Sequence, residues 1–127
     1  MKLLTFNEIV TDAMTRRDVT PEIKAAEAVI KAATLRCGDA LELAIPHKEW
    51  GVWTLALKEL AKDLDPYFVG TSAAATEVGD LFAMLRMQGN QAILDGDAGT
   101  HRTWKADAER SLRLIRLRTI RYVVTGS

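Results

Sequence analysis

The chain has few of the residues that mark secreted, metal-binding or membrane-spanning proteins. It contains one cysteine, Cys37, and two histidines, His47 and His101, among 127 residues. A single thiol rules out an internal disulfide and fits a reducing compartment, so we expect a cytoplasmic protein. One cysteine and two histidines fall short of the three or four ligands that a bound zinc ion requires. We therefore expect no metal and no other cofactor.

Long apolar runs are also missing. No stretch approaches the roughly 20 apolar residues of a membrane span, and we expect no contact with a membrane. Asn7 and Glu8 interrupt the apolar start before it reaches the roughly 7–15 residues of a signal peptide. The chain contains only three prolines and eight glycines. Hydrophobic residues make up 48% of the sequence, which is enough to form a hydrophobic core. Residues 1–127 are expected to form a single domain.

The spacing of apolar residues predicts an all-α fold, a compact bundle of four to five helices. Thr5 to Glu8 has the form of a capping box, which opens a short helix that ends near Arg17. Thr20-Pro21-Glu22 combines an N-cap hydroxyl, a proline at the first helical position and an acid in the first turn. This combination predicts the start of a long helix.

Two apolar seams, each a row of apolar residues at helical spacing, follow Thr20-Pro21-Glu22 in the sequence. The first contains mostly small residues and the second mostly large ones, so we expect them to interdigitate. Gly38 leaves open whether the first helix breaks there. Pro46 is expected to start the second helix, and Asp65-Pro66 is expected to end it. The seams are Ile23, Ala26, Ile30, Ala33, Cys37, Ala40 and Ala44, and then Trp50, Trp53, Leu57, Leu60 and Leu64.

Two more helices complete the predicted bundle. Thr71 or Ser72 can cap the first of them, and the turn from Asp95 to Gly99 ends it. Thr100 or Thr103 opens the last helix, whose β-branched end at Tyr122–Val124 is expected to fray or run extended. The core stripe of the last helix is Trp104, Ala108, Leu112, Ile115, Thr119 and Val123.

Charge is distributed unevenly although its net value is zero. From Gly99 to Ser127, seven arginines and lysines stand against two acids, which gives +5, so residues 1–98 balance at −5. In the last helix, arginines are interleaved with a second apolar strip on the side away from the core stripe. This arginine strip is predicted to bind a partner and consists of Arg110, Arg113, Leu114, Arg116, Leu117, Arg118, Ile120 and Arg121.

Two interpretations of the arginine strip are open. If the bundle covers the last helix on both sides, the arginines lie along the surface or pair with acids of residues 1–98. Otherwise the strip is an interface, since arginine among aliphatic residues is favoured at protein contacts. We expect a non-enzymatic adaptor, assembly or regulatory protein, of a kind frequent in phages and mobile elements, that forms homo-oligomers or docks on a protein partner. Binding of nucleic acid is a further alternative.

One acidic pair suggests an enzymatic alternative. Glu77 and Asp80 are three residues apart and so project from one helix face, as two carboxylates must to hold a magnesium ion. Their segment resembles the second metal motif, an ExxD pair before an apolar run, of the MazG-like all-α nucleotide pyrophosphohydrolases. The resemblance implies an acidic pair on the preceding helix. There Glu59 and Asp63 are available, and Lys62 stands where the family has its second glutamate.

Overall fold

The computed structural model describes residues 21–68, 72–96 and 101–127. Within these ranges the chain is helical and contains no strand, which confirms the predicted all-α bundle. None of the described helices combines the length and apolar character needed to cross a bilayer. The short helix predicted between Thr5 and Arg17 lies outside the described residues. The elements are α2 Pro21–His47, α3 Trp50–Leu64, η1 Asp65–Tyr67, α4 Ala73–Leu94 and α5 His101–Thr125.

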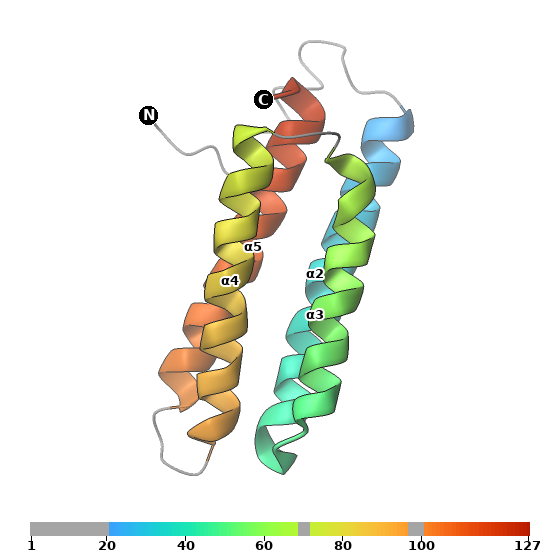
Figure 1. Ribbon diagram of the computed structural model, residues 1–127. Coiled ribbons are helices and arrows are strands. Elements are labelled where there is room, and N and C mark those ends of the chain that lie inside the picture. The colour runs from blue at the N-terminus through green and yellow to red at the C-terminus, as the bar shows by residue number, and fades with distance from the viewer. Residues whose placement is uncertain (1–20, 69–71, 97–100) are drawn as a thin grey trace.

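The helices form two antiparallel hairpins that lie side by side (Figure 1). The first hairpin pairs α2 with α3, and the second pairs α4 with α5. Between the hairpins, α2 packs on α5 and, to a smaller extent, on α4, whereas α3 and α4 touch little. Both predicted seams contribute to a single core cluster, except that Trp50, which was predicted in the second seam, is 42% exposed at the start of α3. The helix α2 runs through Gly38 without a break.

The turn from α2 to α3 differs from the prediction. Pro46 does not start α3, because α2 continues through it for a further residue. The backbone then reverses at Lys48, whose φ is 52°. The Lys48 amide donates to the Ile45 carbonyl at 3.4 Å, and the next amide, of Glu49, donates to Ala44 at 3.0 Å. These two hydrogen bonds form a Schellman cap, which satisfies carbonyls at the end of α2.

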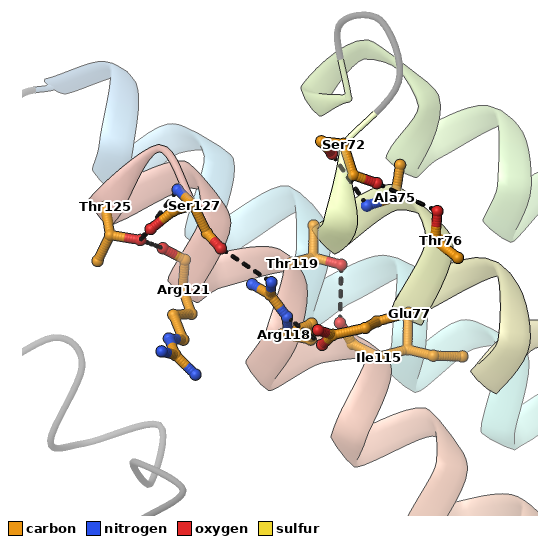
Figure 2. A network of polar contacts seen from close by, with 10 residues as sticks. All are labelled: Ser72, Ala75, Thr76, Glu77, Ile115, Arg118, Thr119, Arg121, Thr125 and Ser127. Carbon is orange, nitrogen blue, oxygen red and sulfur yellow. Dashed lines mark hydrogen bonds and ion pairs between the residues drawn. The ribbon is translucent and has the colours of Figure 1, made fainter. Parts of the chain in front are cut away.

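The end of α5 also differs from the prediction. Tyr122–Val124 neither frays nor runs extended, since α5 remains helical to Thr125. The ring of Tyr122 stacks on Phe68, with the ring centroids 5.2 Å apart. The Thr125 hydroxyl donates to the Arg121 carbonyl at 2.7 Å (Figure 2). A tertiary contact thus holds residues of high β propensity in a helix.

A polar contact in the core fixes α4 against α5. Gln88 and Ser111 are both buried, and their side chains approach to 2.6 Å. With its amide nitrogen turned toward α5, Gln88 donates to the Ser111 hydroxyl and to the carbonyls of Met84 and Asp107. Because a buried polar group without a partner costs free energy, this pair favours one register between the two helices.

A close contact joins α3 to α4 at Trp53 and Gly89. Trp53 is almost fully buried, and a Cβ atom at Gly89 would overlap its indole ring. Glycine inside a helix costs roughly 0.5–1 kcal/mol relative to alanine. The indole therefore occupies space that only glycine leaves free.

Replacing Gly89 by alanine should lower the free energy of unfolding by about 1–3 kcal/mol, because the ring or α4 must shift. Gly79→Ala is the matched control in the same helix, since nothing lies within 4 Å of a Cβ at that position. This control should raise stability by about 0.5–1 kcal/mol. Urea unfolding measures both changes. Equal stability of the two variants would contradict the close approach of Trp53.

Candidate interaction surfaces

The arginine strip of α5 is partly engaged inside the bundle. Arg118 Nε donates to Glu77 Oε2 on α4 at 2.5 Å, and Arg118 Nη2 donates to the Ser127 carbonyl at 2.8 Å (Figure 2). Only 12% of the Arg118 side chain is exposed. A second cation of α5, Lys105, pairs with Glu42 of α2 at 2.9 Å. Two cations of α5 therefore pair with acids of residues 1–98, as the first interpretation of the strip expects.

The apolar part of the strip is not an open surface. Ile120 is 2% exposed and belongs to the core cluster, so it is unavailable to a partner. Leu114 and Leu117 are half-buried. Among the described residues, no large apolar side chain of α5 is fully exposed. The arginines are placed differently: Arg110 and Arg113 are exposed, and Arg116 and Arg121 are half-buried.

The four carboxylates of the enzymatic alternative do not meet. Glu77 and Asp80 lie on α4, and Glu59 and Asp63 lie on α3. Glu77 pairs with Arg118, whereas Asp63 pairs with Arg36 of α2 at 2.8 Å. In the part of the chain that the structure describes, no group of three or more His, Cys, Asp or Glu residues could hold a metal ion. The motif that resembles the hydrolases is thus not accompanied by an assembled metal site.

Large exposed apolar side chains concentrate on α2 and α3. Nine are exposed among the described residues, and three of these lie on α4. The other six are Val29, Leu35, Leu43, Trp50, Val52 and Leu55. Leu43 is 67% exposed and Leu55 is 56% exposed. A helix that is apolar on several sides is normally buried on several sides, and α2 has this pattern.

A groove of about 170 Å³ runs along the outer side of α2 and α3. Small residues line much of it, namely Ala33, Cys37, Ala40 and Ala56. Val52 and Leu55 also line the groove and are exposed beside it. Its charged residues are Arg36, Glu59 and Asp63. The groove thus combines small apolar residues, protruding aliphatic side chains and charges of both signs.

We call this surface the α2–α3 face and define it by seven residues. They are Val29, Arg36, Ala40 and Leu43 of α2, and Val52, Leu55 and Glu59 of α3. The α2 members recur every three, four or seven residues and so lie on one side of the helix. Sequence reasoning missed this face because it followed only the core seams of the two helices and assigned no role to Val29, Leu43, Val52 and Leu55.

Two further grooves have other characters. One, of about 220 Å³, lies between α2 and α5 and mixes Arg113 and Arg116 with Asp39, Glu42 and Glu109. The other, of about 400 Å³, lies between α3 and α4, where the helices touch little. Its lining is Thr54, Leu57, Lys58, Ala61, Phe82, Arg86 and Asn90. The first of these grooves has one exposed large apolar side chain in its lining, Leu35, and the second has none, whereas exposed Val52 and Leu55 both line the groove of the α2–α3 face.

Cys37 lies in the lining of the α2–α3 groove but is only 2% exposed. Burial penalises the thiolate and raises the pKa of the Cys37 thiol to about 12. A thiol that stays protonated at neutral pH is a poor nucleophile. The burial of Cys37 therefore favours a structural role.

In the native protein, a disulfide reagent at pH 8 should label Cys37 far more slowly than in denaturant. Because the folded pKa is about 12 and the ordinary value is 9.0, the unfolded thiol ionises first as the pH rises. Stability contributed by Cys37 is complete below about pH 9 and is lost toward about pH 12. A Cys37→Ala variant should lack this loss. Native labelling as fast as in denaturant would contradict the burial.

Comparison with known proteins leaves the function to be argued from these surfaces, since no family model, curated protein or solved structure matches the chain.

Proposed function

We propose that this protein is a non-enzymatic assembly or adaptor protein that binds another protein through the α2–α3 face. The observation that supports the proposal is the concentration of exposed large apolar side chains on this face, next to a groove lined by small residues. Scattered apolar side chains on a surface are ordinary, but a group of them rimmed by charges is typical of an interaction site. The single cysteine suits a reducing compartment, and we place the protein in the cytoplasm.

The energetics of such a face favour association. Burying apolar surface contributes about 25 cal/mol per Å², so covering several exposed valine and leucine side chains supplies a large part of the affinity. Exposed charges act mainly on the rate and the choice of partner. In this proposal the α2–α3 face holds the partner, and the exposed arginines of α5, Arg110 and Arg113, act on the rate of encounter.

The two alternatives have less support. A magnesium-dependent hydrolase needs its carboxylates in one place, and here Glu77 is paired with Arg118 while Asp63 is paired with Arg36. Binding of nucleic acid usually requires a strongly basic surface. The chain as a whole is neutral, and Arg118 is occupied by its contact with α4.

Changing both Leu43 and Leu55 to glutamate should abolish association with the protein partner, because charges would replace the exposed apolar contacts. Both side chains are exposed, so the free energy of unfolding should change by no more than about 0.5 kcal/mol. The matched control changes Met84 and Met87, two exposed residues of α4, to glutamate. Binding is measured by sedimentation and by cross-linking in extracts of the native host.

The proposal fails if the α4 variant loses the complex and the Leu43/Leu55 variant keeps it. The enzymatic alternative is tested with the same preparations. We expect no magnesium-dependent release of pyrophosphate from nucleoside triphosphates. Turnover that disappears in a Glu77→Gln variant would replace the binding function with a hydrolase.

A further inference from the structure

We propose that the occupant of the α2–α3 face is a second copy of this chain, bound as a symmetric dimer. This inference rests on the proposed function, since it uses the same face. A two-fold contact pairs one surface with itself, so that surface must carry both a projection and a hollow that receives it. The α2–α3 face carries both, because exposed Leu55 stands beside a groove of about 170 Å³. An engineered cavity of about 150 Å³ admits a benzene molecule, so a groove of this size admits an aliphatic side chain.

The ion pair between Arg36 and Asp63 sets the levels of α2 and α3 along the face. Leu43 lies seven residues beyond Arg36 along α2, and Leu55 lies eight residues before Asp63 along the antiparallel α3. At about 1.5 Å per residue these separations are about 10 and 12 Å, so Leu43 and Leu55 lie at nearly the same level. A two-fold axis along the groove places α2 of each copy over α3 of the other. Leu43 of one copy then meets Leu55 of the second copy, on both sides of the axis.

The charges of the face complement each other under the same axis. Glu59 lines the groove and has no ion pair with another described residue. The Arg36 side chain is 64% exposed although it contacts Asp63. Glu59 precedes Asp63 by one helical turn, so Arg36 of one copy reaches Glu59 of the second copy. A face with charges of only one sign would repel a second copy of itself, whereas this face carries charges of both signs.

The size of the face is sufficient for a stable dimer. The accessible surface of the subunit is 7739 Å², and a standard interface takes about 800 Å² from each partner, roughly a tenth of a small protein's surface. At about 1.5 Å per residue, the 27 residues of α2 extend for about 40 Å and the 15 residues of α3 for about 22 Å, so the face has the length that such an interface needs. The dimer also covers α2 on a second side, as its distribution of apolar residues favours.

Sedimentation equilibrium of the purified full chain, from low micromolar to several hundred micromolar, measures the mass directly. We expect a dimer that dissociates on dilution. Leu55→Glu should give a monomer whose thermal melt equals that of the wild type at concentrations where the wild type is also monomeric, because the side chain is exposed in the subunit. Met84→Glu, an exposed change on α4, should leave the dimer intact.

A charge exchange tests the two-fold arrangement itself. Glu59→Arg sets two arginines against each other at both symmetric contacts, and Arg36→Glu sets two glutamates against each other. Each variant alone should dimerise about tenfold more weakly at low salt than the wild type, with a smaller difference at high salt. In an equal mixture, every contact again joins an arginine to a glutamate. Native mass spectrometry should therefore find a heterodimer of the two variants restored to near the wild-type affinity.

The outcomes separate the dimer from the broader proposal. A wild-type protein that stays monomeric at the highest concentration, a dimer unaffected by Leu55→Glu, or a mixture without the heterodimer overturns the dimer. If the wild type is a monomer but a different protein binds it and requires Leu43 and Leu55, the dimer fails and the proposed function stands. If no association of any kind depends on these two leucines, both fail.

Discussion

The close packing of α2 against its neighbours is the interaction on which the rest of the structure depends. Alanine, cysteine and isoleucine side chains of α2 fill the core together with Trp53 and the leucines of α3. Small side chains let helix axes approach closely, but they are too short to fill the outer crevice between α2 and α3. The residues that tighten the core, such as Ala33 and Cys37, therefore also line a groove on the surface. Core packing and the proposed interface are two consequences of one alanine-rich helix.

Some cations of α5 form ion pairs inside the fold and others stay exposed, a difference that the net charge of zero does not show. Arg118 links α5 to Glu77 of α4 and to the last residue of the chain, and Lys105 links α5 to α2. The pair of Lys105 with Glu42 joins the two hairpins, whereas the pair of Arg118 with Glu77 joins the two helices of the second hairpin. The excess of charge in the last helix is thus partly a property of the fold, and the remaining exposed arginines are left for attraction at a distance.

Local signals predicted most of the fold, and the two errors at helix ends have different causes. Pro21, Ser72 and Asp65-Pro66 mark helix ends through backbone chemistry that is visible in the sequence, and each prediction is confirmed. The reversal at Lys48 needs a positive φ at a residue that seldom adopts it, and no sequence pattern announces it. The helical end of α5 depends on stacking with a residue more than fifty positions away.

The candidate site was harder to predict, because the sequence of α2 is apolar on several sides and only the placement of α3 and α5 decides which side is left exposed.

Oxidative footprinting with hydroxyl radicals, at low and at high protein concentration, tests most directly whether the protein associates through the α2–α3 face. Leu43, Val52 and Leu55 should become protected as the concentration rises, while Met84 and Met87 on α4 keep their reactivity. Unchanged reactivity of the three α2–α3 residues, with protection elsewhere or none, would contradict the account.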